Sequence, residues 1–399
     1  MLAACTASAP PAAPAALGQL KIGILVPFTE SAIDSDIGAS QRRAADLYLK
    51  LKGGALAGRE VQLVYNDESS LDPATNKVRI QQFLDQDHVE LLLGGVGTAA
   101  AYMLRDTADG TKMVYIDTNA SANALTRTTP GCAPTCKSTY VFRTAPSSWQ
   151  MGEPLGEWAA KAGRKDFFVV NGDDAFGAES AAAFIDGLAK NGGQVTGRSA
   201  VPAKSGADWT KLVAAIKAQP TKNVFAAFIT DDAEGFIVAW DVAGMRAAGY
   251  ALVGPGALAE APVLDVVKQA ALGITTSFPW STELDSAENK AFVDAFKKAY
   301  KDDTTGQPLA PDGYAVEMWN TMRVLEEALK ATKGDTKHAD ALIAALEAVS
   351  FTGPAGSFTF DRTTHNGIED VYIREVRASG GTLVNAVVDK VSAVKDPGQ

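Results

Sequence analysis

Short apolar runs alternate with amphipathic stretches along most of the chain, which predicts strands alternating with helices. Lys21–Pro27 (KIGILVP) has the continuous apolar pattern of a buried strand, and Ala39–Lys52 has helical spacing that ends at two glycines. The alternation continues with strands at 61–67, 91–93 and 113–116 and a helix at 73–85. Strands separated by helices form parallel sheets with helices on both faces, so we predict an α/β fold with a doubly wound sheet.

The same alternation restarts after Trp149, which predicts a second α/β lobe of like topology. Its expected elements are strands at 167–171, 194–201 and 224–229, and helices at 151–161, 176–190, 209–218 and 235–247. Residues 287–349 are rich in helical patterns, and the tail has strand patterns at 358–360, 371–376 and 382–388. We place lobe 1 at 20–145 plus 276–355, and lobe 2 at 146–275 plus 356–399.

Composition limits the classes of partner. The chain has 399 residues, enough for two domains, and its 46% hydrophobic and 21% charged content is that of a globular protein. Its formal net charge of −10 argues against nucleic acid or an anionic membrane surface as a partner. No apolar run approaches the roughly 20 residues that a membrane-spanning helix needs.

The N-terminal residues have the pattern of a bacterial lipoprotein. Leu2-Ala3-Ala4-Cys5 matches a lipobox, in which the cysteine becomes a lipidated N-terminus after cleavage. Residues 6–17 are small, rich in proline and without periodicity, as in a flexible tether. A chance match in an Ala-rich stretch is the alternative. We expect residues 1–19 to be lipobox and tether, and Cys5 to hold an extracytoplasmic protein to the membrane by lipid alone.

The other two cysteines, Cys132 and Cys136, lie in one short loop. In an exported protein this spacing favours a structural disulfide, with a pair of free thiols as the alternative. A zinc site would need more ligands, and His88, His338 and His365 are scattered singly without ligand spacing. We therefore expect a disulfide and no metal.

Residues 91–121 contain the most informative motif. They read as strand, Gly-rich turn, helix, strand and a second polar turn. Gly95-x-Gly97-x-x-Ala100, followed by Asp117, matches a dinucleotide-binding fingerprint. However, the motif follows about the third strand rather than the first, and no hydride-transfer residues are evident downstream.

The same two turns suit a smaller anion. A helix N-terminus with a hydroxyl beside it binds a carboxylate, and both turns lie at the carboxyl edge of the predicted parallel sheet. Taking both turns as helix starts, we expect the carboxylate of a solute to bind at Gly97 and Thr98 and at Asn119, Ala120 and Ser121.

The equivalent edge of the second lobe carries acidic turns at 172–177 and 229–235. Phe176 opens a helix beside a glycine, which favours stacking on an apolar or aromatic ligand. The aspartates of both turns are explained as helix N-caps, with Asp231 or Asp232 meeting a ligand cation as the alternative. The sequence contains no Gly-x-Ser-x-Gly elbow and no His–Cys pair in one motif, so we expect neither an enzyme nor a cofactor.

An ordered series of segments resembles the type I periplasmic solute-binding proteins of ABC transporters, in the branched-chain amino-acid group. The segments cover nearly all of residues 20–375 and include KIGILVPFTES, LAGREVQLVYND, DPATNKVRIQQFLDQDHVELLLGG, YVFRTAPSS, DDAFGAES and GPAGSFTFD. Each segment is weak evidence alone, but the ordered series is specific. The resemblance implies two α/β lobes that are joined by a three-crossing hinge and close on a solute.

The resemblance also implies roles for single residues. Thr98, Asn119 and Ser121 fall at positions that hold the ligand's carboxylate. The remaining ligand-facing positions are Ile37 in the first loop, Phe176 on the aromatic wall of the second lobe, and Thr230 or Asp231 near another wall position.

One position departs from the family pattern. Amino-acid binders have an acidic residue after the Gly-Pro of the strand LVGP, where it meets the ligand's ammonium group, whereas here Gly256 follows. An unpaired ammonium in a closed cleft would cost several kcal/mol. Either Asp231 or Asp232 substitutes, or the ligand has no ammonium. Segments around Trp149 and 118–126 resemble binders of aromatic carboxylates, which favours an aromatic acid over a leucine-type amino acid.

We therefore expect the extracytoplasmic solute-binding component of an ABC importer, which captures a small carboxylate by lobe closure and delivers it to the permease. One alternative is a ligand-sensing module of a receptor, which would require an attached transmembrane or signalling segment. The other is an NAD-dependent oxidoreductase that rests on the Gly95-x-Gly97 motif.

Overall fold

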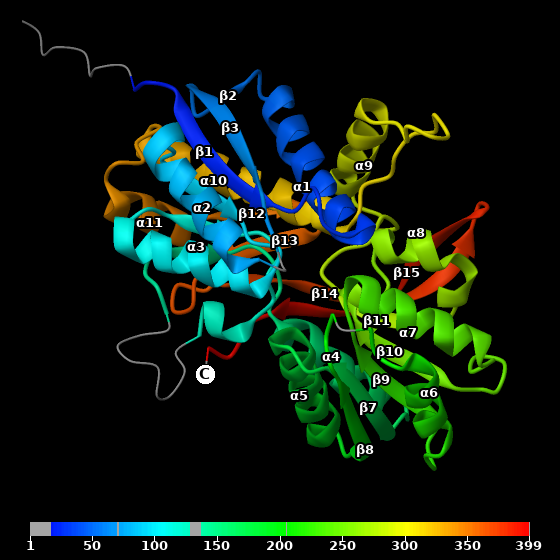
Figure 1. The fold of residues 1–399 in the computed structure, drawn as a ribbon. Helices are drawn as coiled ribbons and strands as arrows, with labels where there is room; N and C mark the ends of the chain where they lie inside the picture. Colours follow the sequence, from blue (N-terminus) through cyan, green and yellow to red (C-terminus); the bar gives the residue numbers. More distant parts are fainter. Residues whose placement is uncertain (1–16, 70–71, 128–136, 205, 399) are drawn as a thin grey trace, which may run out of the picture.

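The computed structural model describes residues 17–69, 72–127, 137–204 and 206–398. Cys5, Cys132 and Cys136 lie outside these residues, and with them the predicted lipid anchor and disulfide. The described residues form two α/β lobes, as predicted (Figure 1). In this part of the chain no helix has both the length and the apolar content needed to cross a membrane.

The first lobe is built on a six-stranded sheet in the order β2-β3-β1-β4-β5-β6. All neighbouring strands are parallel except β2 and β3. The strands are β1 (Leu20–Val26), β2 (Ala55–Leu56), β3 (Arg59–Asp67), β4 (Leu91–Gly94), β5 (Tyr115–Asp117) and β6 (Val141–Arg143). The connecting helices are α1 (Ala32–Leu51), α2 (Pro73–Gln82) and α3 (Thr98–Thr111).

The second lobe contains five parallel strands in the order β8-β7-β9-β10-β11. They are β7 (Asp166–Gly172), β8 (Gln194–Val201), β9 (Asn223–Ala227), β10 (Ala251–Pro255) and β11 (Thr275–Phe278). The associated helices are α4 (Ser148–Lys161), α5 (Ala175–Lys190), α6 (Trp209–Lys217), α7 (Thr230–Val242) and α8 (Ala261–Val267). The central strands are buried, which explains their unbroken apolar runs.

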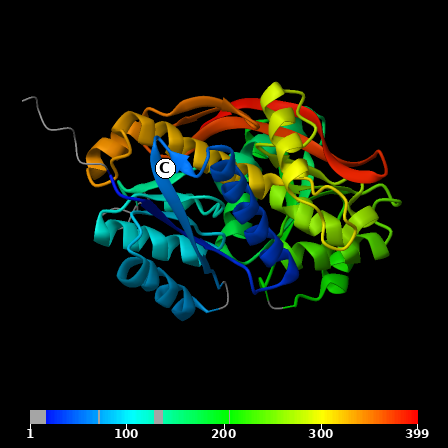
Figure 2. The same cartoon turned by 90° about the horizontal axis from the view of Figure 1, so that it is seen from above.

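The C-terminal part spans both lobes. Its elements are α9 (Ala287–Ala299), α10 (Gly313–Thr332), α11 (Ala339–Glu347), β12 (Ser350–Gly353), β13 (Gly356–Phe360), β14 (Gly367–Ser379) and β15 (Thr382–Val394). Helix α10 packs on α1 of the first lobe, whereas β14 pairs with β13 at its start and antiparallel with β11 further along. Figure 2 shows this orange and red part of the chain running across both lobes. The exact lobe boundaries stay a prediction. We placed one boundary at residue 355, and the strands on either side of it, β12 and β13, pair with each other.

A buried arginine joins the two lobes where the chain crosses between them. Arg143, at the end of β6, is fully buried. It donates to Ala122 O at 2.6 Å and Thr126 Oγ1 at 2.8 Å, and its Nε donates to Asn366 Oδ1 just before β14. The loop after β5 is therefore fixed to the strand that continues into the second lobe.

Element boundaries differ from the prediction mainly at helix ends. Helix α1 begins seven residues before the predicted Ala39, because the Ser31 hydroxyl caps it by accepting from Asp34 N. Helix α2 continues as a π-helical segment, Phe83–Asp87. Strands β14 and β15 are longer than predicted, and the Gly380-Gly381 turn between them has positive φ at both residues, as a tight hairpin turn requires.

Replacing Gly38 should destabilise the first lobe. Gly38 lies in α1, and an added Cβ would stand 1.7 Å from the carbonyl oxygen of Pro27, so helix and strand end would have to separate. We expect G38A to lower the free energy of unfolding by about 1–3 kcal/mol, as measured by urea titration. The matched control is G110A in α3, where an added Cβ meets nothing within 4 Å and alanine is favoured in a helix. Equal stability of G38A and wild type would contradict the close approach.

Candidate functional site

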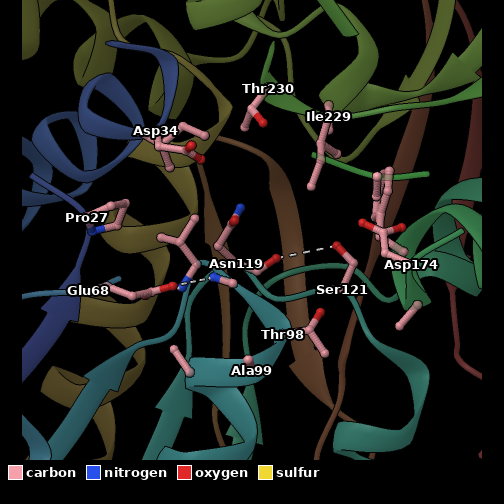
Figure 3. Close-up of a pocket in the computed structure, with 18 of the residues that line it drawn as sticks. Pro27, Asp34, Glu68, Thr98, Ala99, Asn119, Ser121, Asp174, Ile229 and Thr230 are labelled. Atoms are coloured by element: carbon pink, nitrogen blue, oxygen red, sulfur yellow. Dashed lines mark hydrogen bonds between the residues drawn. The ribbon is translucent and has the colours of Figure 1, made fainter. Parts of the chain in front are cut away.

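A cavity of about 440 Å³ lies between the lobes, at the carboxyl ends of the parallel strands of both sheets (Figure 3). Ligands of open α/β sheets bind at this edge because the loops there leave a crevice. In the first lobe the lining residues follow β1, β3, β4 and β5: Pro27, Glu30, Glu68, residues 96–100, Asn119 and Ser121. In the second lobe they follow β7 to β10 or, for Phe278, end β11: residues 173–176, Ala203, Lys204, Ile229, Thr230, Ala257 and Phe278.

The structure brings most of the predicted site residues together. The predicted residues that line the cavity are Ile37, Gly97, Thr98, Asn119, Ser121, Phe176 and Thr230. Three others do not line it. Ala120 is buried and donates its N–H to Gly95 O and Asp117 Oδ1, Asp231 is exposed, and Gly256 is buried against Phe278. Their roles in binding stay predictions.

The Gly-rich turn after β4 is closed by a carboxyl group that we did not predict. Glu68, which follows β3, is 2% exposed and accepts the N–H groups of Val96 at 2.8 Å and Gly97 at 2.6 Å. Burial raises its pKa to about 8, although both N–H groups act in the opposite direction. Because these N–H groups already have an acceptor, the turn lacks the donors with which a dinucleotide fingerprint binds pyrophosphate.

The backbone N–H groups that follow this turn, at the start of α3, are available to a smaller anion. Gly97 is the N-cap of α3. The N–H groups of Thr98, Ala99 and Ala100 lie in the first helical turn, where no intrahelical acceptor is available, and all three residues line the cavity. With the Thr98 hydroxyl, this helix start suits a carboxylate.

The second polar turn, Asn119–Ser121, is not the start of an α-helix, which corrects the prediction of two helix starts. A short 3₁₀ turn, Asn123–Leu125, follows it. The turn is held by other contacts: Ser121 O accepts from Ser148 N at 2.7 Å, at the beginning of α4. Figure 3 shows Ser121 and Thr98 near each other, with Asp34 and Thr230 across the cavity. Loop residues, not an α-helix terminus, therefore line this part of the cavity.

The second lobe contributes an aromatic ring and a strained residue. Phe176 is 8% exposed and lies in the first turn of α5, which Asp174 caps through Gly177 N at 2.8 Å, as predicted. Thr230 has a φ of 48°, a left-handed conformation that is costly for a β-branched residue. Such strain is concentrated at functional sites, where surrounding packing maintains it.

The aspartates of α7 were predicted as N-caps or as a partner for a ligand cation. Neither caps the helix, because Ile229 occupies that position. Asp232 accepts Lys204 N at 2.8 Å, and neither Asp231 nor Asp232 lines the cavity. Their carboxylates are therefore directed to the protein and to solvent.

Phe278 occupies the space beside Gly256. A Cβ added to Gly256 would lie 2.3 Å from the Phe278 ring, and this ring lines the cavity. The guanidinium of Arg374 lies over the same ring, 4.9 Å from its centroid. An acidic side chain at position 256 would collide with the ring, so this wall of the cavity is aromatic rather than acidic.

Several acidic lining residues were missed from the sequence. Asp34 lies in the first turn of α1, and its pKa is raised by burial, against the opposing charge of Lys204. Glu317 lies on α10, accepts Asn119 Nδ2 at 3.1 Å, and has its pKa raised well above the ordinary value by burial. Glu68 follows a strand in the polar run 66–68, which was an available signal. Glu317 had none, because α10 has the pattern of an ordinary core helix. Among the described residues no cluster of three or more potential metal ligands occurs.

Comparison with known proteins gives consistent matches. A family model described as periplasmic binding protein matches residues 19–382. Leu/Ile/Val-binding protein homolog 6 of Brucella suis biovar 1 (strain 1330) is 26% identical over 381 residues, covering 95% of this chain and 93% of that protein.

Two solved structures are similar over almost their whole length. The solute-binding protein of an ABC transporter from Rhodopseudomonas palustris BisB5, in complex with 3,4-dihydroxybenzoic acid, is 28% identical, with a TM-score of 0.85 and coverage of 95% of this chain and 99% of that one. An R. palustris solute-binding protein in complex with benzoate is also 28% identical, with a TM-score of 0.80 and coverage of 94% and 99%.

The role of Glu68 predicts a pH-dependent stability difference between wild type and E68Q. At pH 5 we expect E68Q to be less stable by about 1–3 kcal/mol, because its NH₂ group faces one of the two N–H donors. Unfolded glutamate titrates near 4.5 and folded Glu68 near 8, so the unfolded state loses its proton first. Wild-type stability therefore falls as the pH rises through this window, by at most about 1.4 kcal/mol per pH unit.

The measurement is urea unfolding of both proteins from pH 5 to pH 8. The advantage of the wild type over E68Q should shrink steadily with pH and change sign once the accumulated fall exceeds the difference at pH 5. A difference that stays constant would show that Glu68 does not hold its proton in the folded state.

Proposed function

Since this chain belongs to the periplasmic binding protein family, we propose that it is the extracytoplasmic solute-binding component of an ABC importer and captures a small aromatic carboxylate. The proposal draws on the two R. palustris proteins, which are bound to 3,4-dihydroxybenzoic acid and benzoate. It rests equally on the chemistry of the cavity itself.

The observation that carries the choice of ligand is the contact between Gly256 and Phe278. The ring fills the space that a side chain at 256 would need, so no acidic group can project from there toward a ligand ammonium. With Phe176 from the second lobe and Ile37 from the first, the cavity has apolar walls on both sides. A planar aromatic ring suits such walls, because stacking and apolar contact stabilise it without unpaired charges.

The carboxylate end is assigned to the first lobe. The N–H groups at the start of α3 and the hydroxyl of Thr98 offer several donors within one small region, and the Ser121 hydroxyl, which donates to Asn119 O at 3.4 Å in this structure, would turn to the ligand. Donors aimed at one point satisfy a carboxylate that has lost its water, and the helix terminus adds a favourable dipole.

Binding is coupled to closure of the lobes. The ligand contacts loops from both sheets at once, so it binds the closed arrangement more tightly than an open one and shifts the population toward it. No chemical step is needed. The closed protein would then deliver the solute to an ABC-transporter permease.

Two features outside the described residues complete the proposal. Cys5, in the lipobox sequence Leu2-Ala3-Ala4-Cys5, would carry the lipid that holds the protein at the membrane. Cys132 and Cys136, four positions apart in one loop, would form a disulfide in an oxidising compartment.

A ligand screen tests the proposal directly. We expect benzoate, 4-hydroxybenzoate or 3,4-dihydroxybenzoate to raise the melting temperature, since a ligand at 100 times its Kd stabilises the folded state by about 2.7 kcal/mol. Leucine, isoleucine and valine serve as the comparison set. Stabilisation by these amino acids alone would contradict the aromatic assignment and favour the amino-acid alternative, in which Asp34 or another lining acid meets the ammonium group.

A substitution of Thr98 tests the carboxylate position. T98V keeps the shape of the side chain but removes its hydroxyl, and we expect a Kd about 5- to 30-fold higher for the aromatic acid that binds best, the equivalent of about 1–2 kcal/mol. T107V is the matched control in the same helix, because the Thr107 hydroxyl donates to Met103 O away from the cavity. Unchanged affinity of T98V by calorimetry would show that the carboxylate lies elsewhere.

A further inference from the structure

Phe278, which forms the aromatic wall of the cavity, lies in a slot between two backbone segments. On one side is Gly256, where an added Cβ would lie 2.3 Å from the ring carbon Cδ2. On the other side is Gly313, the first residue of α10, where an added Cβ would lie 2.4 Å from the ring carbon Cε1. Cδ2 and Cε1 are opposite corners of the ring, so the two glycines hold it from opposite edges.

A buried ion pair closes the slot on a third side. The guanidinium of Arg374 on β14 lies over the ring, 4.9 Å from its centroid, and pairs with Glu260 at 2.9 Å. Glu260 in turn accepts the N–H of Gly313 at 3.0 Å, and Arg374 donates to Trp280 O at 2.7 Å. Both charged side chains are buried. Because separating a buried ion pair is strongly unfavourable, the ring cannot move to this side.

Both lobes contribute to the slot. Phe278 and Arg374 lie on neighbouring strands of the second sheet, β11 and β14. Gly313 begins α10, which packs on α1 of the first lobe, and the Ser40 hydroxyl of α1 donates to Asp312, the N-cap of α10. Gly313 itself does not line the cavity. A residue outside the cavity, on a helix packed against the first lobe, therefore fixes a ring that lines the cavity from the second.

We propose that Gly313 is a specificity-determining residue, because it sets how far the Phe278 ring projects into the cavity and thereby the length of the aromatic acid that fits. With Gly256 and Arg374 on the other sides, the ring can make room for a side chain at 313 only by moving into the cavity. The inference rests on the proposed function, in which the carboxylate lies at α3 and the ligand's ring points to the second lobe. A substituent para to the carboxylate then meets Phe278 first.

The test compares benzoate with 4-methylbenzoate, which is longer by one methyl group and adds no polar atom. In G313A we expect the Kd of 4-methylbenzoate, measured by calorimetry, to rise by about tenfold more than that of benzoate, because the ring is pushed toward the para position. F278A removes the wall, so we expect it to favour 4-methylbenzoate relative to the wild type. Adding G313A to F278A should leave the ratio of the two Kd values within about twofold.

The matched control is G187A. Gly187 lies where α5 packs on α4, and an added Cβ would stand 2.0 Å from Glu153 O, away from the cavity. This substitution crowds a backbone as G313A does, and we expect it to lower the melting temperature without changing the ratio of the two Kd values. A shift of the ratio in G313A is thus separated from a general loss of stability.

A measurement without ligand separates this inference from the proposed function. The added methyl group and the ring collide whether or not a ligand is present, so G313A should lower the melting temperature of the wild type more than that of F278A. The added Cβ would also lie 3.1 Å from Glu260 Cδ, but this contact is common to both backgrounds and cancels in the comparison. The difference is measurable even if no aromatic acid binds, an outcome that would contradict only the proposed function.

Three results would overturn the inference: an equal loss of melting temperature in the two backgrounds, an unchanged Kd ratio in G313A, or the same change of ratio when G313A is added to F278A. If G313A folds only when Phe278 is removed, that is the extreme form of the expected difference. G256A, which crowds the opposite edge of the ring, then takes its place in the Kd comparison with the same expected shift. If G313A folds in neither background while F278A folds alone, the clash is not with the ring and the inference fails.

Discussion

The site depends on one constraint of parallel sheets. All strands of a parallel sheet end at the same edge, and in this protein both sheets direct that edge to one cavity. Residues that are distant in sequence, such as Glu68, Thr98 and Phe176, therefore meet because each follows the carboxyl end of a strand. The backbone of these loops is available for ligands since the ladder hydrogen bonds stop where the strands stop.

The connection between the lobes involves the same loops. Arg143 donates hydrogen bonds both to the loop after β5 and to Asn366, which leads into β14. At the start of α4, Ser148 N donates to Ser121 O. The turn that presents Asn119 and Ser121 to the cavity is thus packed against segments that cross between the lobes. A ligand that contacts this turn acts where the relative position of the lobes is decided, which gives closure a direct physical route.

Two acids of the cavity lining, Glu68 and Glu317, are buried, and burial opposes their negative charge. Burial raises the pKa of both, to about 8 for Glu68, so the protonated form of each is favoured over the charged form. Glu68 shapes the turn before α3, and Glu317 supports Asn119. An aromatic wall at Phe278 then replaces the acidic wall that an amino-acid ligand would need.

The sequence by itself determined the α/β alternation, the two lobes and several residues that line the cavity, because these follow from local periodicity and from residues adjacent to strand ends. Gly97, Thr98, Asn119, Ser121 and Phe176 were predicted in this way and line the cavity, while their roles in binding stay predictions. Only the tertiary structure decided that Glu68 occupies two N–H groups of the Gly-rich turn, that Phe278 fills the space beside Gly256, and that Glu317 reaches Asn119. It also showed that the turn at 119–121 does not start an α-helix. These contacts join positions that are far apart in the chain, and their partners are selected by packing between elements, which leaves no periodic trace in a single sequence.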